Sequence, residues 1–147
     1  MLRREFLKRF INWTFGILGL GMLASSIHLY PKEAKEMQTK YFPVINSDDA
    51  PQKGVKKITL TYADNRGENE ARIFLAVLPE GMTAFSAVCS HLGCLVDWDR
   101  GKELFLCPCH GGKYDIAGNV AGGPQPEPLT RLPVEIREGK VFVGIRV

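Results

Sequence analysis

The sequence predicts a small antiparallel β domain preceded by one N-terminal apolar helix. Short strand-like runs separated by turn signals fill the second half of the chain, and a single long uncharged stretch lies near its start. The 15 glycines and 9 prolines favour turns over long helices. A chain of 147 residues has room for one compact domain with an appendage, which excludes a large multidomain enzyme.

The net charge of +3 is concentrated in residues 1–9, where Arg3, Arg4, Lys8 and Arg9 outnumber Glu5. Setting these four aside from the 19 basic residues, and Glu5 from the 16 acidic ones, leaves 15 of each sign in residues 10–147. The body of the protein is therefore neutral, and we expect no nucleic-acid binding.

Residues 10–30 form an uncharged stretch. A helix of this length measures about 31 Å, close to the hydrocarbon thickness of about 30 Å, so we predict a single-pass transmembrane helix. The basic flank 1–9 then lies on the cytoplasmic side and the head domain on the periplasmic or outer side. A cleaved signal peptide ending near Ala24 is the alternative, but its apolar region is usually only about 7–15 residues long.

The basic flank itself carries a second signal. Its sequence, Arg3-Arg4-Glu5-Phe6-Leu7-Lys8, resembles the twin-arginine export signal R-R-x-F-L-K. A bare arginine pair would serve the positive-inside rule equally well, but the Phe-Leu-Lys continuation adds specificity. The resemblance implies export of a protein that has already folded around a cofactor.

Residues 31–54 are polar and contain prolines, which predicts a tether or hinge. The head domain is expected over residues 55–147, where alternating or short apolar runs predict strands. These runs are 57–62, 71–78, 83–88, 103–106, 134–136 and 141–147.

All four cysteines and two of the three histidines lie in two short loops. The first reads Cys89-Ser90-His91-Leu92-Gly93-Cys94, and the second reads Cys107-Pro108-Cys109-His110-Gly111. Tetrahedral zinc would use only four of the six candidate ligands and normally has other spacings. Two disulfides would leave both histidines unexplained. From the residues alone, a metal site, a pair of disulfides and a mixture of the two stay open.

The pattern C-x-H-x-G-C followed by C-P-C-H-G resembles the signature of Rieske iron-sulfur proteins, and the second cysteine of each loop is similar to those of cytochrome bc-type quinol-oxidising complexes. The resemblance implies an all-β fold, a small antiparallel β-sandwich with an inserted cluster-binding subdomain whose loops span 85–128. It also implies one 2Fe-2S cluster per chain. The implied roles are iron ligands for Cys89, His91, Cys107 and His110, and a disulfide for Cys94 and Cys109.

The resemblance also assigns roles around the cluster. Leu92 would shield it, Pro124 in the segment 122–126 would cover it, and Tyr114 would bond a ligand sulfur. Three glycines would allow close backbone approach and donate N–H bonds to sulfur, namely Gly93, Gly111 and Gly112. Related proteins of high potential carry serine where this chain has Gly112, so we expect a lower midpoint potential, and Gly112→Ser should raise it.

The function implied is a redox subunit of a respiratory quinol-oxidising complex, not a complete enzyme alone. It would take one electron from quinol, with menaquinol favoured, and pass it to a c-type cytochrome. His110, and beside it His91, would contact the quinol held by a cytochrome b-type subunit in a prokaryotic cytoplasmic membrane. The main alternative is the Rieske small subunit of an arsenite-oxidase-like molybdenum enzyme. Two others are a Rieske ferredoxin or oxygenase domain and a zinc-stabilised binding module.

Overall fold

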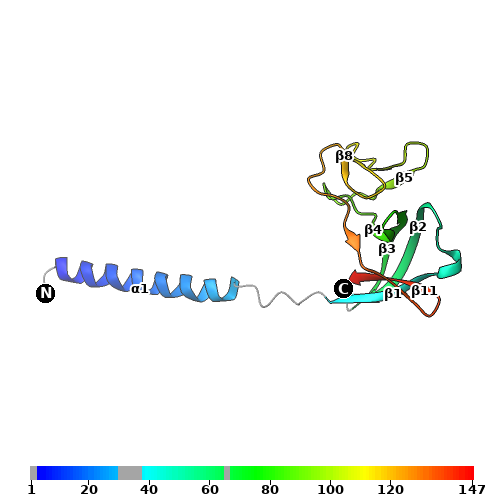
Figure 1. Cartoon of the computed structure of the whole chain (residues 1–147). Helices are drawn as coiled ribbons and strands as arrows, with labels where there is room; N and C mark the ends of the chain where they lie inside the picture. Colours follow the sequence, from blue (N-terminus) through cyan, green and yellow to red (C-terminus); the bar gives the residue numbers. More distant parts are fainter. Residues whose placement is uncertain (1–2, 30–37, 65–66) are drawn as a thin grey trace. The chain divides into compact units, whose positions relative to one another are not determined.

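The computed structural model describes residues 3–29, 38–64 and 67–147. One compact unit contains helix α1 (Arg3–Leu29), and the other contains the strands. In the second unit a short 3-10 helix, Ser47–Asp49, follows the first strand (Figure 1). The strands are β1 (Thr39–Asn46), β2 (Gly54–Asp64), β3 (Gly67–Leu78), β4 (Gly81–Ser86), β5 (Asp97–Asp99), β6 (Leu104–Leu106), β7 (Lys113–Tyr114), β8 (Val120–Gly122), β9 (Arg131–Leu132), β10 (Val134–Arg137) and β11 (Lys140–Arg146).

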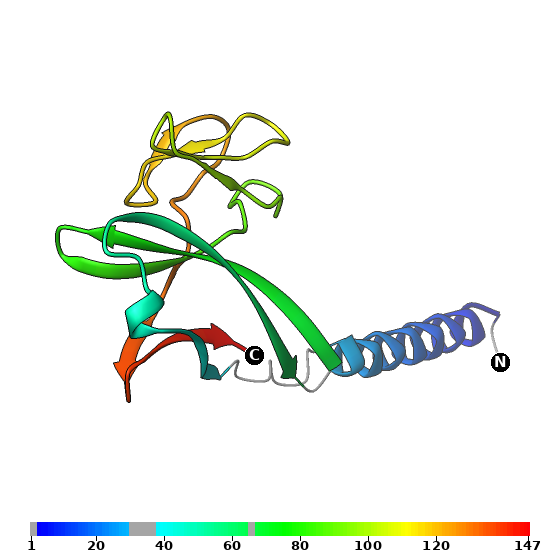
Figure 2. The same cartoon turned by 90° about the vertical axis from the view of Figure 1, so that its right-hand side faces the viewer.

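The strand-bearing unit, which we call the head, contains three antiparallel sheets. Their strand orders are β1-β11-β10, β2-β3-β4-β9 and β5-β6-β7-β8. The third sheet is inserted in the chain between β4 and β9, and it lies at one end of the head in both views (Figures 1 and 2). The predicted antiparallel β head is therefore confirmed.

The second half of strand β3, residues 73–78, is covered on both faces and links two cores. Ile73 and Leu75 pack with Val141 and Val143 of β11, which joins the first two sheets face to face. The alternate residues of β3, beginning with Phe74, pack against the third sheet. Because side chains alternate across a strand, a strand covered on both faces needs a continuous apolar run, and residues 73–78 supply it.

The core beneath the third sheet is aromatic. The ring of Phe105 on β6 lies 4.9 Å from Phe74, 6.0 Å from Phe85 and 4.7 Å from Trp98, measured between centroids. Tyr114 on β7 is fully buried in the same core. These contacts fix the third sheet, and the loops at its edge, against β3 and β4.

The predicted tether over 31–54 is too long. Strand β1 pairs with β11 from Thr39 to Asn46, so the sheet structure begins well before residue 55. Pro43 suggested a break in structure, but it lies where the register between β1 and β11 shifts, and such irregularities accommodate proline. The part of the predicted tether at 31–37 lies outside the described residues.

The predicted transmembrane helix over 10–30, whose last residue lies outside the described residues, is not supported by the structure. Among the residues described, no helix combines enough length with enough apolar character to cross a membrane. Helix α1 begins at Arg3 with charged turns, and Asn12 and Thr14 interrupt its apolar side chains.

The six predicted strand runs overlap β2, β3, β4, β6, β10 and β11. Besides β1, the strands that were not predicted are β5, β7, β8 and β9, each of two or three residues. A run this short has too few alternations to produce a periodic signal.

Candidate metal centre

The first cysteine-histidine loop follows β4 and is closed by its own backbone. The N–H of Cys89 donates to the carbonyl of Cys94 at 2.8 Å, and the N–H of Gly93 donates to the carbonyl of Cys89 at 3.0 Å. Gly93 adopts a positive φ of 75°, which a residue with a Cβ rarely takes.

The second loop, between β6 and β7, repeats this geometry. The N–H of Cys107 donates to the carbonyl of Gly112 at 2.8 Å, the N–H of Gly111 donates to the carbonyl of Cys107 at 3.1 Å, and Gly111 has a φ of 71°. The N–H groups of Gly93 and Gly111 thus donate to carbonyls within their own loops, and their expected bonds to sulfur stay a prediction. Each of these glycines is needed for its turn.

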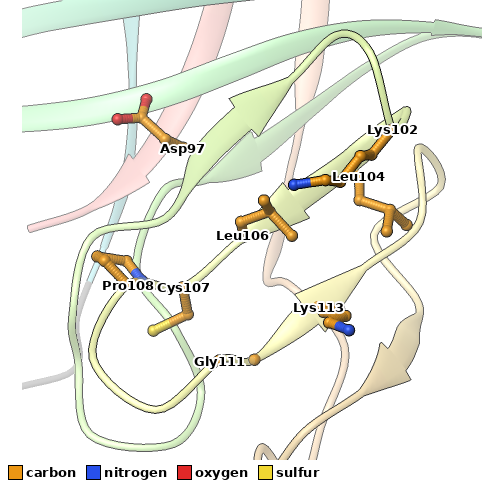
Figure 3. Close-up of a pocket in the computed structure, with 9 residues that line it drawn as sticks. Asp97, Lys102, Leu104, Leu106, Cys107, Pro108, Gly111 and Lys113 are labelled. Carbon is orange, nitrogen blue, oxygen red and sulfur yellow. The ribbon is translucent and has the colours of Figure 1, made fainter.

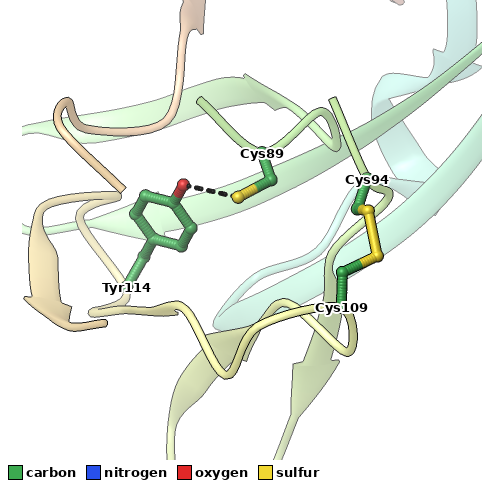
Figure 4. The surroundings of a disulfide bond; sticks show 4 residues. All are labelled: Cys89, Cys94, Cys109 and Tyr114. Atoms are coloured by element: carbon green, nitrogen blue, oxygen red, sulfur yellow. Dashed lines mark hydrogen bonds between the residues drawn. A yellow bond between two sulfur atoms is a disulfide. The ribbon is translucent and has the colours of Figure 1, made fainter. Parts of the chain in front are cut away.

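A disulfide between Cys94 and Cys109 joins the two loops (Figure 4). It links residues 15 apart whose Cα atoms are 6.5 Å apart. The Sγ atoms of Cys94, Cys107 and Cys109 all lie within 4.8 Å of one another, but two of these sulfurs are bonded together and are not available as thiolate ligands. Cys89 and Cys107 are the free cysteines, and both are buried.

The two histidines face each other across the loops. The rings of His91 and His110 meet edge to face, with centroids 4.9 Å apart. The Nδ1 atom of His91 is buried and has no hydrogen-bond partner among the described residues. A buried polar atom without a partner is costly, so a ligand at this nitrogen would remove the cost. His110 is exposed, and His91 is partly buried.

Hydrogen bonds converge on the sulfur of Cys89. Burial raises the pKa of this thiol, but the phenol of Tyr114, the backbone N–H of His91, the thiol of Cys107 and the backbone N–H of Leu92 together hold the pKa below its usual value. The two free cysteines are thus close enough to interact. The surroundings of Cys89 favour the thiolate, which is the form that binds metal.

Tyr114 and Ser90 support this arrangement from the other side. The backbone N–H of Ser90 donates to the Tyr114 hydroxyl at 3.2 Å, and the Ser90 hydroxyl donates to the carbonyl of Glu127 at 2.7 Å. Burial, and next the hydrogen bond with Cys89, raise the pKa of Tyr114, so it remains a neutral donor. Tyr114 was named from the sequence, whereas Ser90 was not, because nothing in its local pattern indicates the contact with Glu127.

The segment 122–126 lies directly against the second loop. A Cβ built on Gly123 would come 2.7 Å from the Cα of Gly112 and 3.1 Å from the carbonyl oxygen of Gly111. Pro124, the residue named from the sequence, is exposed, whereas Gln125 beside it is only 5% exposed. Sequence reasoning missed Gln125, because its burial depends on packing between segments and not on any local pattern.

A pocket of about 500 Å³ adjoins the second loop and the strands β6 and β7 (Figure 3). Leu104, Leu106 and Pro108 give it apolar walls, and Lys102 and Lys113 add positive charge. Cys107 is among its lining residues, but neither histidine is. A partner that contacts the histidines would therefore use a different face of the loops.

The exposed surface of the first loop is apolar. Leu92 is 70% exposed at the loop tip, beside His91, and Val88 and Leu95 flank the loop with 45% and 40% of their surfaces exposed. Exposed apolar side chains gathered in one place indicate an interaction surface.

The donor set of these loops fits an iron-sulfur cluster with mixed ligation. Two buried free thiols and two facing imidazoles provide two sulfur and two nitrogen donors, as a Rieske-type 2Fe-2S cluster requires. The unpartnered Nδ1 of His91 and the thiolate-favouring surroundings of Cys89 agree with metal binding. The fold and the site together define an iron-sulfur protein of the antiparallel β class.

Comparisons with known proteins specify the family. The chain matches the Rieske [2Fe-2S] domain over residues 40–133. It is 33% identical over 144 residues to the cytochrome b6-f complex iron-sulfur subunit of Chlorobaculum tepidum, covering 97% of this chain and 75% of that protein. The same subunit of Chlorobaculum thiosulfatiphilum is 36% identical over 100 residues, 63% of this chain and 55% of the relative. This chain belongs to the Rieske family, whose cofactor is a 2Fe-2S cluster.

The fold has a counterpart among solved structures. The cyanobacterial plasma membrane Rieske protein PetC3 from Synechocystis PCC 6803 superposes with a TM-score of 0.52 and 24% sequence identity. The match covers 69% of this chain and 97% of that protein. At this level of identity the likeness concerns the fold alone.

Proposed function

We propose that this chain is the Rieske electron-transfer subunit of a quinol-oxidising cytochrome bc-type complex. It would accept one electron from quinol and pass it to a c-type cytochrome, as a redox subunit and not as a complete enzyme. The observation that carries the proposal is the match with the cytochrome b6-f complex iron-sulfur subunit of Chlorobaculum tepidum over 97% of this chain. The disulfide between the two loops supports it, because this bond accounts for the second cysteine of each loop and leaves two free cysteines and two facing histidines as ligands.

The proposed iron ligands are Cys89 and Cys107 for one iron, and His91 and His110 for the other. Both cysteines are buried and free, and the disulfide holds their loops together. When bound, the 2Fe-2S cluster supplies a one-electron acceptor whose potential is raised by imidazole ligands in place of two thiolates. The buried core around Phe105 and Tyr114 keeps water away from the cysteine side of the site.

His110 is proposed as the quinol contact, with His91 beside it. The exposure of His110 supports this choice, because a quinol in a partner subunit can reach only an imidazole at the surface. An imidazole nitrogen can accept both a hydrogen bond and a proton, so His110 would take up the hydrogen bond and the proton of the quinol hydroxyl. The exposed Leu92 would then enter an apolar pocket of a cytochrome b-type subunit.

Menaquinol is the favoured donor. Gly112 offers no hydroxyl to the site, whereas a serine there would donate a hydrogen bond to the cluster. A missing donor leaves the more negative reduced state less stabilised and lowers the potential. A cluster with a low midpoint potential is suited to accept an electron from a quinol that also has a low midpoint potential, such as menaquinol.

The head is proposed to lie on the periplasmic or outer side of a prokaryotic cytoplasmic membrane, held there as a subunit of the complex. The Cys94–Cys109 disulfide supports this location, because disulfides persist in oxidising compartments. The twin-arginine-like sequence at Arg3 and Arg4 would direct export of the folded, cluster-bearing protein.

The test is a redox titration monitored by electron paramagnetic resonance in native membranes, with and without a quinol-site inhibitor. A Rieske-type signal that changes with the inhibitor and with the redox state of the quinone pool supports the proposal. Copurification of the chain with haem b is the second expected result. A signal insensitive to both, with copurification of molybdenum, would overturn it in favour of the arsenite-oxidase-like subunit.

A further inference from the structure

Gln125 is a buried polar residue with a fixed orientation. Its Nε2 donates to the backbone carbonyl of Lys113 at 2.7 Å and to that of Gly122 at 2.8 Å. These two bonds use both hydrogens of the amide. The amide cannot be reversed, since Oε1 would then face two carbonyl oxygens.

The other end of this amide points at the second loop. A Cβ built on Gly112 would lie 2.7 Å from Oε1 of Gln125, and one built on Gly123 would lie 2.6 Å from it. The position of the Gly112 Cβ is also 3.3 Å from the Cβ of Cys107. The Gln125 oxygen thus occupies the space that a side chain at position 112 would enter, close to Cys107.

This oxygen has no hydrogen-bond donor in the described part of the chain, and it is buried. It is the negative end of an amide dipole, fixed in surroundings of low dielectric. An unpaired buried acceptor costs free energy, so its presence needs an explanation. Its position against Gly112, whose built Cβ lies 3.3 Å from the Cβ of the proposed ligand Cys107, suggests an effect on the cluster site.

We propose that Gln125 is a positioning residue that fastens the segment 122–126 to the second loop, requires glycine at position 112 and lowers the midpoint potential of the cluster. The proposal rests on the proposed role of Cys107 as an iron ligand. Reduction adds one negative charge to the site, and a fixed carbonyl oxygen facing Gly112 of the second loop disfavours that charge. Gln125 and Gly112 therefore act as a pair, and the absence of a serine at 112 has a steric cause.

The expectation that Gly112→Ser simply raises the potential changes accordingly. The Cβ and hydroxyl of a serine would displace the Gln125 amide, which is held by two hydrogen bonds. Gly112→Ser should be tolerated only when Gln125 is shortened. The single substitution should destabilise the head and reduce the amount of bound cluster.

The test compares full-length wild-type protein with Gly112→Ser, Gln125→Ala, Gln125→Leu and the double variant Gly112→Ser/Gln125→Ala. Bound cluster is measured by visible absorbance, stability by the thermal midpoint, and potential by a redox titration of the purified protein. The double variant should have a higher thermal midpoint and more cluster than Gly112→Ser alone. Gln125→Ala and Gln125→Leu should both raise the potential, and the leucine variant does so without leaving room for water.

Gly101→Ser, with and without Gln125→Ala, is the matched control. A Cβ at Gly101 would meet only Asp99 Oδ1 at 3.5 Å, and the effects of these two substitutions should add.

If Gly112→Ser does not fold, folding of the double variant supports the proposal, and failure of both overturns it. Additive effects of Gly112→Ser and Gln125→Ala, or an unchanged or lower potential in Gln125→Leu, also overturn it. A wild-type protein without an iron-sulfur spectrum would instead count against the proposed function.

Discussion

The hydroxyl of Tyr114 lies 3.2 Å from the Sγ of Cys89, and the neighbouring hydrogen bonds favour the tyrosine as the donor (Figure 4). The N–H of Ser90 already donates to this hydroxyl, and the Ser90 hydroxyl donates its own hydrogen to Glu127. The phenolic hydrogen is therefore left for the sulfur of Cys89, with the Ser90 oxygen at 3.3 Å as the competing acceptor. A negative thiolate is the stronger of the two acceptors.

Tyr114→Phe should lower the midpoint potential and retain the cluster. In the wild type, the hydrogen bond from Tyr114 to Cys89 stabilises the more negative reduced state, and the variant loses it. A hydrogen bond to a charged group contributes about 1.5–3 kcal/mol. For a one-electron couple, about 1.4 kcal/mol corresponds to about 59 mV, so a fall of tens of millivolts is expected in a redox titration. Tyr62→Phe on β2, where the ring packs on Phe42, is the control and should leave the potential unchanged. An unchanged potential in Tyr114→Phe would show that the hydrogen bond does not act on the redox site.

The double variant Cys94→Ala/Cys109→Ala should lower the free energy of unfolding of the head by about 3 kcal/mol. This is the chain-entropy value for a closed loop of about 15 residues, which matches the separation of the two cysteines. Guanidinium unfolding of the variant, and of the wild type with and without reductant, measures the effect. Reduced wild type should behave like the variant. Equal stability of oxidised and reduced wild type would contradict the prediction.

The sequence predicted the two loops well because their chemistry is local. The spacing of Cys89, His91, Cys107 and His110 can be read from the sequence. The turn at Gly93 requires only that a glycine occupy this position, because its φ is positive. The carbonyl acceptors of the glycine N–H groups could not be predicted from the sequence, because an N–H has a choice of acceptors that only the folded loop decides. Here the carbonyls within each loop are the acceptors.

The parts that the sequence did not predict depend on contacts between distant segments. Strand β1 is held by pairing with β11, whose partner residues lie 94 to 107 positions later, and Pro43 obscured its local pattern. Gln125 resembles an ordinary polar loop residue until Gly112 and Lys113 are placed around it. Propensity and periodicity describe neighbours in sequence, and these two features are made by neighbours in space.

Asp99 should make the stability of the head depend on pH in acid. The side chain of Lys102 holds the pKa of Asp99 below its usual value of 3.8, helped by the backbone N–H groups of Lys102 and Gly101. Because the folded pKa is depressed, the stabilisation is complete above the unfolded pKa and is lost as the pH falls through the folded pKa. Thermal midpoints measured from about pH 5 downward should therefore fall less steeply in Asp99→Asn than in wild type. The difference between the pH profiles of wild type and variant should be small and should decrease as salt is added, because the Asp99–Lys102 ion pair lies near the surface. Parallel pH profiles would contradict this prediction.

Leu92→Asp should reduce quinol oxidation several-fold or more while leaving the cluster spectrum unchanged. Leu92 is 70% exposed, so its replacement should change the free energy of unfolding by only about 0.5 kcal/mol. In the proposed complex, however, the same side chain enters an apolar pocket, where a carboxylate would be costly. Ile136→Asp is the matched control, because Ile136 on β10 is 60% exposed and belongs to the sheet away from the loops. Turnover should be measured in membranes that contain equal amounts of each variant. Equal loss of turnover in both variants, or none in Leu92→Asp, would exclude this loop tip as the docking surface.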